Sequence, residues 1–350
     1  MTISLDAALS GLKTAQQTLD VISTNIANAS TPGYTRKILP QYSLFVGGTG
    51  VGVAAGVISR NVNNALLADI NNQSSVVGRY NIRQKYLQNI QNFHGPSEAG
   101  RSLSAQIASL ANVFAKLSNA PDDINLLNDT VSNATMTTRK INDFANLITK
   151  MRTDSETDIS SSVNIVNQAL DTIARTNVQI TTYAGQGKST SDLEDQRDSA
   201  IQTVSQYMQI STFRSGQQIL VVTKKGQTLA DDAAHHLFFQ ASNMLPTSYY
   251  PSGGLNGLTV DSASGTDIAG DSIGGQLGAL LELRDQTLPQ YTAQLDEFSQ
   301  RLADRFQNEG LRLFTDLDGT VPPNANDPAH VSYVGFSSRI KVNDAIISDP

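Results

Sequence analysis

The hydrophobic positions of the first 34 residues follow a seven-residue repeat. Leucine or isoleucine recurs at every seventh residue, and a small or medium apolar residue stands three places later. The members are Leu5, Leu12, Leu19 and Ile26, followed by Ala8, Ala15, Ile22 and Ala29. This spacing places all eight side chains on one stripe of a helix, called the seam below, as in a coiled coil. We expect the seam to need a partner helix, because the remaining positions are mostly polar or alanine and carry few charges.

A proline and a glycine end this repeat. Pro32 disfavours helical backbone at Thr31 and removes a backbone donor. Pro32-Gly33 fits the two central positions of a type II turn, in which glycine supplies the positive φ. We expect Pro32, Gly33 and Tyr34 to set the angle at which the chain leaves the helix.

Three ordered segments here resemble the amino-terminal signature of bacterial flagellar axial proteins, a family of rod, hook and hook-associated proteins. They are Ser10-Gly11-Leu12, Leu19 to Asn28, and Ser30 to Arg36. The resemblance implies that residues 1–34 form the outer part of a terminal coiled coil that lines an axial tube. It therefore implies a self-assembling structural subunit. Periodicity alone favours an ordinary amphipathic core helix that stops at Pro-Gly, and the ordered identities decide against that interpretation.

Residues 35–61 predict an extended connector. Lys37 to Leu44 has strand character, and Gly47 to Val53 reads as a flexible glycine stretch. Gly50 and Gly52 also match part of a dinucleotide-binding fingerprint, but that fingerprint needs a strand before it and a helix opening at it. A hinged connector, as in hook-associated proteins, is the better interpretation.

From residue 62 to residue 208 the apolar positions have helical spacing. Five stripes, which begin at Leu66, Leu103, Leu127, Ile159 and Leu193, predict a succession of long helices. Their short connections predict an antiparallel bundle. Asn177 interrupts the fourth stripe at a core position, where a polar residue can fix register. Ser191-x-x-Glu194 has the form of a capping box at the start of the fifth helix.

The fifth helix carries four acids and one arginine between residues 192 and 198. We interpret them as a solvated face with the acidic bias that suits a helix amino end, and not as catalytic carboxylates. Leu193, Asp195, Arg197 and Asp198 also resemble a motif of the FlgK family of hook-associated proteins. Gly274 to Asp285 resembles the same family. These two resemblances place the chain in the hook-associated branch of the flagellar axial proteins and distinguish it from rod and hook proteins.

Near Gln209 the apolar residues change from helical spacing to every second position, the spacing of a β-strand. Residues 209–275 predict a β-rich segment that contains a β-meander, and residues 276–310 a helix returning to the bundle. Residues 311–350 predict the start of an outer, irregular region with short strands at Val331–Phe336 and Ile340–Val342. The fold class is therefore mainly α with a smaller β-rich portion. Relatives in the family pair the opening helix with a carboxyl-terminal heptad helix that we do not find before Pro350, so we expect a fragment or a partner helix located elsewhere.

Composition removes several classes of function. The 350 residues include no Cys and no Trp, and the formal charge is −7. Disulfides and thiolate metal sites are thus excluded, and the acidic balance argues against a nucleic-acid partner. No stretch of 18 apolar residues predicts a membrane span, and the amino terminus lacks the pattern of a cleaved signal peptide.

Candidate chemical sites are weak. His235 and His236 are adjacent, and neighbouring residues of a strand point to opposite faces, so they converge poorly on one metal ion. Asp316-x-Asp318-Gly319 lacks the later acidic ligands of a calcium loop. No nucleophile stands with a plausible base. We therefore predict no catalytic residues, no metal and no cofactor.

The functional expectation is a secreted structural subunit of the bacterial flagellum that joins hook to filament. The resemblance implies as partners further copies of the chain, the hook protein on one side, the next junction protein on the other, and an export chaperone in the cytoplasm. A flagellar hook or distal-rod subunit is the nearest alternative. The long helical middle of this chain argues against that alternative, because hook and rod proteins pass into β-domains soon after the opening helix. An extracellular adhesin or hydrolase with a flagellar-type leader is the alternative from a different class.

Overall fold

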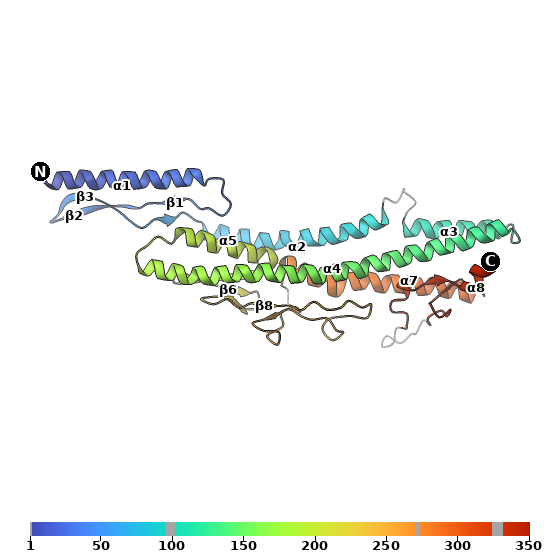
Figure 1. Cartoon of the computed structure of the whole chain (residues 1–350). Coiled ribbons are helices and arrows are strands. Elements are labelled where there is room, and N and C mark those ends of the chain that lie inside the picture. The colour runs from blue at the N-terminus through green and yellow to red at the C-terminus, as the bar shows by residue number, and fades with distance from the viewer. Residues whose placement is uncertain (1, 96–101, 271–272, 324–331) are drawn as a thin grey trace. The chain divides into compact units, whose positions relative to one another are not determined.

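The structure is a computed structural model that describes residues 2–95, 102–270, 273–323 and 332–350 (Figure 1). Long helices and short antiparallel sheets confirm the predicted fold class, mainly α with a smaller β-rich portion. The chain divides into two compact units, each assembled from separate segments. The first comprises Met1–Arg79, Ser162–Phe238 and Leu258–Gly278, and the second comprises Tyr80–Ser161, Phe239–Gly257 and Ala279–Pro350.

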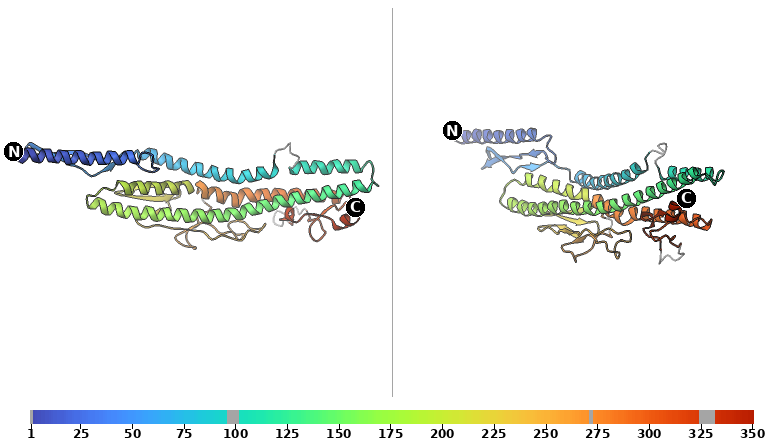
Figure 2. Two further views of the ribbon diagram at one scale, coloured as in Figure 1. Left: turned by 45° about the horizontal axis from the view of Figure 1, so that its top comes forward. Right: turned by 45° about the vertical axis from the view of Figure 1, so that its right-hand side comes forward.

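The first unit opens with a helix that lies along a β hairpin (Figures 1 and 2). Strand β3 (Thr49–Ala55) contacts helix α1 (Thr2–Ala27) and pairs antiparallel with β2 (Gln41–Val46). The segments that flank this hairpin in the sequence, β1 (Lys37–Ile38) and β4 (Ser59–Arg60), pair antiparallel with each other. The expected flexible stretch at Gly47–Val53 is therefore wrong for residues 49–53, which form a strand. A Cβ added to Gly52 would lie 2.5 Å from Ser10 Oγ, so glycine here permits close contact with α1.

The body of the first unit consists of helices and two small sheets. Its helices are the start of α2 (Asn64–His94), the end of α4 (Ile124–Gly185) and α5 (Ser191–Tyr207). The meander consists of β5 (Ile210–Ser215), β6 (Gln218–Thr223) and β7 (Thr228–Ala230), and β8 (Leu237–Phe238) pairs with β9 (Thr259–Val260). The apolar stripe of α4 packs in this core, where Ile173 and Ile180 are fully buried.

The second unit contains the rest of α2, α3 (Leu103–Leu117), the first part of α4 and α7 (Leu288–Asn308). Helix α6 (Gly275–Glu282) continues through a π-helical turn, η2 (Leu283–Thr287), directly into α7. The remaining elements are short. They are β10 (Phe314–Thr315), which pairs with β11 (Lys341–Val342), the 3₁₀ turn η3 (Phe336–Ser338) and α8 (Asp344–Ser348).

Three local expectations are wrong. The third and fourth stripes belong to one continuous helix, the 62-residue α4. The strand expected at Val331–Phe336 is absent over residues 332–336, which form turns and the start of η3, while Val331 lies outside the described residues. The capping box at Ser191 does not form. Thr190 is the N-cap residue of α5, and its Oγ1 donates to Glu194 Oε1 at 2.7 Å.

Candidate assembly surfaces

Helix α1 turns a face of small and polar residues toward the hairpin. The more buried positions recur at helical spacing, as at Ala7, Ser10, Thr14 and Thr18. Gln41 Nε2 donates to Thr18 Oγ1 at 2.9 Å, and the backbone N–H of Val53 donates to Ser10 Oγ at 3.1 Å. The hairpin therefore packs against α1 through hydrogen bonds and close backbone contact, and leaves the larger side chains elsewhere.

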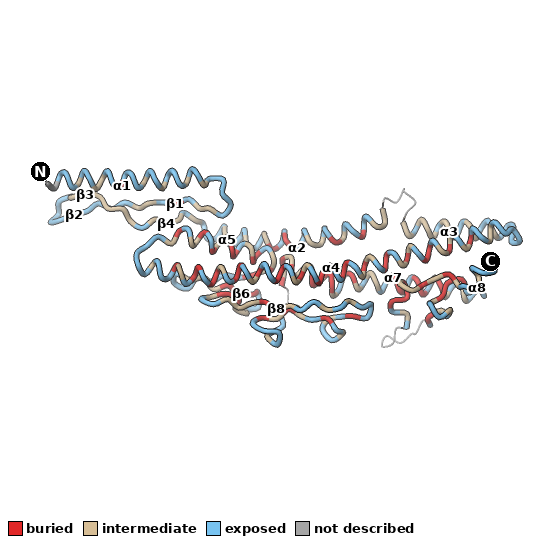
Figure 3. The backbone as a smooth tube through the Cα atoms, viewed as in Figure 1, coloured by how far each residue is buried: buried red, intermediate tan, exposed pale blue. Residues whose placement is uncertain are grey.

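The seam lies on the outside of α1 and faces solvent. Leu5, Leu12, Leu19 and Ile26 are 70, 68, 63 and 71% exposed. Ile22 and the seam residues Ala8, Ala15 and Ala29 are exposed as well. Figure 3 shows α1 exposed along most of its length. Burial of each large seam side chain would stabilise the folded state by about 1.5–3 kcal/mol. Because these side chains are exposed, the chain by itself lacks this stabilisation.

The turn after α1 is tightly bonded. The backbone N–H of Tyr34 donates to Thr31 O at 3.2 Å, and Gly33 has φ of 81°, a backbone angle that favours glycine. The Tyr34 hydroxyl donates to Asn25 Oδ1 at 2.9 Å. Asn25 also exchanges two hydrogen bonds with the backbone of Lys37, at 2.8 and 2.9 Å. These bonds fix the end of α1 to β1.

Two cations join this amino-terminal module, residues 1–60, to α5. Lys37 and Arg60 stand opposite each other on β1 and β4, and the side chain of each is only 5% exposed. Lys37 Nζ forms an ion pair with Asp195 and lies 3.2 Å from Asp192. The Arg60 guanidinium binds three α5 carboxylates. They are Glu194 at 2.7 Å, Asp195 at 2.9 Å and Asp198 at 2.7 Å.

The charges in this cluster stabilise one another. Burial alone would raise the pKa of Asp195, but hydrogen bonds from Lys37, Thr35 and Arg60 hold the pKa below its usual value. Burial alone would lower the pKa of Arg60, and its carboxylate partners raise it instead. The interpretation of residues 192–198 as a solvated face is therefore wrong for Asp195, which α5 buries against the module, and for Arg197, which is fully buried.

Arg197 is fully buried and belongs to a second polar cluster. Its Nη1 donates to Asn177 Oδ1 at 3.0 Å and to Gln217 O at 2.9 Å. Asn177 Oδ1 also accepts from the backbone N–H of Ile219 at 3.0 Å, while Nδ2 donates to Ile219 O at 2.8 Å and Asp231 O at 2.6 Å. The cluster joins α4, α5 and the meander. Of the four motif residues, Leu193 and Asp198 are half-buried and Asp195 and Arg197 are buried.

The sequence offered weak signals for the partners of this motif. Lys37 and Arg60 flank the uncharged hairpin, but they lie 158 and 135 residues from Asp195 along the chain. No local spacing connects groups at such a separation. Only the pairing of β1 with β4, which places Lys37 and Arg60 directly opposite each other, could have suggested that both cations bind the same group of carboxylates.

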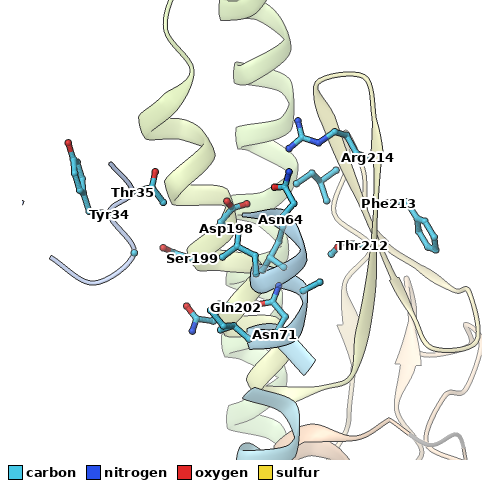
Figure 4. A pocket seen from close by; sticks show the side chains of 16 residues that line it. Tyr34, Thr35, Asn64, Asn71, Asp198, Ser199, Gln202, Thr212, Phe213 and Arg214 are labelled. Atoms are coloured by element: carbon cyan, nitrogen blue, oxygen red, sulfur yellow. The ribbon is translucent and has the colours of Figure 1, made fainter. Parts of the chain in front are cut away.

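A cleft lies beside this junction (Figure 4). Its lining comes from the turn after α1, from α2, from α5 and from the β5–β6 hairpin. The apolar part includes Leu67, Ile70 and Ile201, and the polar part includes Asn64, Asn71 and Gln202. The lining includes amides and hydroxyls but only two charged groups, Asp198 and Arg214, and Asp198 already binds Arg60. This composition suits contact with another chain better than it suits chemistry.

The weak chemical candidates have structural partners. His235 Nδ1 lies 2.9 Å from Asp261 Oδ1, and His236 Nε2 lies 2.8 Å from Asp171 Oδ1, so the two rings bind different carboxylates. Asp316 forms an ion pair with Arg339 at 2.9 Å. Within the described residues, no group of three or more His, Asp or Glu side chains could hold a metal ion. No described helix is long and apolar enough to cross a membrane.

Comparisons with known proteins agree with the resemblance noted from the sequence. The model of the flagellar hook-associated protein FlgK helical domain matches residues 87–324, and that of the flagella basal body rod protein matches residues 5–35. Flagellar hook-associated protein 1 of Salmonella typhimurium strain LT2 is 26% identical over 334 residues, which cover 91% of this chain and 58% of the relative. The same protein of Escherichia coli K12 is 25% identical over 335 residues, 88% of this chain and 57% of the relative.

This chain thus spans less than three fifths of the length of these curated relatives. Among solved structures, the flagellar hook junction protein FlgK from Burkholderia pseudomallei superposes with a TM-score of 0.57 at 23% identity. That match covers 73% of this chain and 45% of the other, and it supports the fold. The helical-domain match alone extends over more than half of the sequence and includes the motif in α5. The chain therefore belongs to the FlgK family of flagellar hook-associated proteins.

Proposed function

We propose that the chain is a non-enzymatic structural subunit of the bacterial flagellum, which joins hook to filament by assembling through the α1 seam. The observation that carries the proposal is the orientation of α1, whose leucine and isoleucine side chains face water while its polar side packs on the hairpin. A helix with this arrangement is stabilised when a second heptad helix covers the seam. The names of the curated relatives support the location in the flagellum.

The rest of the chain has roles that follow from this placement. The helical body between residues 62 and 208 makes lateral contacts between copies, and the β-rich segment faces outward. The partners are other copies, the hook protein and the next junction protein, with an export chaperone before secretion. A hook or rod subunit is less well supported, because the rod-protein match ends at residue 35 and the hook-associated match continues to residue 324.

Acidic substitutions in the seam test this proposal. Leu12→Asp and Leu19→Asp place a carboxylate where a partner helix packs, so we expect incorporation at the hook–filament junction to fall at least tenfold. Both side chains are already exposed, so the thermal melt of the purified chain, followed by circular dichroism, changes little. Electron microscopy of isolated flagella and immunoblots of the medium measure incorporation and export.

Lys13→Asp is the matched control. It introduces the same carboxylate at an exposed position next to Leu12 but outside the seam. We expect this variant to be exported and incorporated as the wild type is. Normal incorporation of both leucine variants, with export intact, is the result that contradicts assembly through the seam.

A further inference from the structure

The β2–β3 hairpin has a second exposed apolar surface, on the side away from α1. All six residues of β2 are exposed, and Tyr42, Leu44 and Val46 are 61, 44 and 68% exposed. Gln41 binds α1 through Thr18, so by strand alternation Tyr42, Leu44 and Val46 lie on the opposite face. Figure 3 shows β2 exposed along its length. Nothing in the described part of the first unit covers this face.

The outer edge of this hairpin is also open. β2 pairs with β3 in a two-stranded sheet, so one side of its backbone has no ladder partner within that sheet. Soluble proteins usually guard such edges with charged side chains or proline inside the strand. Residues 38–59 contain no charged side chain, and the only proline among them, Pro40, precedes β2. An unguarded apolar edge of this length is typical of a surface that pairs with another chain.

Charge and position together indicate the partner. A surface without charges has nothing to attract a strongly charged protein, and an equally uncharged apolar surface covers it best. The module formed by residues 1–60 itself carries two such surfaces, the seam on α1 and the outer face of the hairpin. Two different adhesive faces on one module allow each copy to contact the next in a ring or helix, as heterologous interfaces do.

We propose that the outer face and edge of β2 pack against the same module of a neighbouring copy of this chain, as a contact separate from the seam. The inference rests on the proposed function, because it needs copies that assemble side by side. The seam would hold partner helices together, and the hairpin would join one copy to the next. Tyr42, Leu44 and Val46 form the contact.

Photocrosslinking tests this contact in assembled flagella. Tyr42 is replaced by p-benzoylphenylalanine, an aromatic residue of related shape, in the full-length protein expressed in its own bacterium. After irradiation we expect an adduct that mass spectrometry identifies as two copies of this chain. An adduct with a different protein, or no adduct, overturns the inference. The same probe in place of Leu12 reports on the seam.

Substitutions provide the second measurement. Tyr42→Asp and Val46→Asp should lower incorporation at the junction at least fivefold and leave the thermal melt unchanged, because both side chains are exposed in the free chain. Phe238→Asp is the matched control, since Phe238 is another exposed aromatic residue on a short strand of the same unit and lies outside the cleft beside α5. Wild-type incorporation of both hairpin variants overturns the inference.

The two proposals fail in different ways. If the probe at position 12 cross-links and Leu12→Asp blocks assembly, while the hairpin probe and variants behave as the control does, the seam stands and the hairpin contact is rejected. If the seam variants assemble normally and neither probe joins two copies, self-assembly through this module is rejected, and the hairpin inference is rejected with it.

Discussion

Asn177 joins three elements with a single side chain. The heptad pattern predicted a core position, and the fully buried Asn177 occupies one. The sequence indicated a polar interruption but could not indicate its partners, which are Arg197, the backbone of Ile219 and the carbonyl of Asp231. All the hydrogen-bonding capacity of the amide is used, so the position stabilises one arrangement of α4, α5 and the meander.

We predict that Asn177→Ala lowers the free energy of unfolding by about 2–4 kcal/mol, because it leaves Arg197 and backbone groups of the meander buried without partners. Urea unfolding followed by circular dichroism measures the change, which suits a chain without tryptophan. Asn164→Ala is the control, because Asn164 is an exposed asparagine on the same helix. Equal stability of the two variants contradicts a structural role for the cluster.

At the scale of elements, α4 shows where periodicity fails as a guide. The third apolar stripe ends at Ile148 and the fourth begins at Ile159, and the charged residues Arg152 and Glu156 stand between them. Both charged residues are only 2% exposed. Arg152 Nη2 donates to Ser248 O at 2.7 Å, and Glu156 accepts from Arg284 at 2.8 Å. Buried positions filled by paired polar residues continue the helical face, but an apolar pattern cannot reveal them.

The seam of α1 is the opposite case. Its large side chains lie on the predicted stripe, and an apolar repeat of seven is visible without any partner in the chain. The packing of the hairpin was not predictable, since it depends on Ser10, Thr18 and Gly52, which follow no hydrophobic pattern. An exposed apolar repeat can be found from sequence more readily than the polar contacts that hold its helix in place.

Gly78 marks a close approach of α2 to α5. A Cβ at this position would overlap the backbone oxygen of Gln206. We predict that Gly78→Ala lowers the free energy of unfolding by about 1–3 kcal/mol, although alanine is favoured over glycine in helices by about 1 kcal/mol. Gly11→Ala is the control. Its Cβ meets nothing within 4 Å, so the change should stabilise the chain slightly. Thermal melts of both variants measure the effect. Stabilisation by Gly78→Ala would contradict the close packing of α2 against α5.

On the scale of the whole molecule, two buried carboxyl groups, one in each unit, respond to acid in opposite directions. In the first unit, the pKa of Asp195 is held below its usual value by Lys37, Thr35 and Arg60, which outweigh its burial. In the second unit, burial raises the pKa of Asp296 despite hydrogen bonds from Ser337 and Gly335. The carboxylate of Asp195 therefore stabilises the fold near neutral pH, while protonation of Asp296 becomes easier in the folded chain than in the unfolded one.

We predict that Asp195→Asn is destabilising by about 1–3 kcal/mol at pH 7, and that this difference shrinks as pH falls below about 4. The sign follows from the lowered pKa of Asp195, because its stabilising charge is present above the unfolded pKa and lost as pH falls through the folded one. Urea unfolding at pH 7, 4 and 3 measures it. Asp192→Asn is the control, since Asp192 also faces Lys37 but its side chain is 92% exposed. A difference that does not depend on pH would contradict the role of the charge.

The outward orientation of the seam has a consequence for the free protein inside the cell. The large seam side chains are exposed in the free chain, before any junction exists. Two nascent or newly finished copies that meet would bury these leucines against each other in the wrong place. On the proposed assembly through the seam, we therefore expect the unassembled chain to self-associate as its concentration rises.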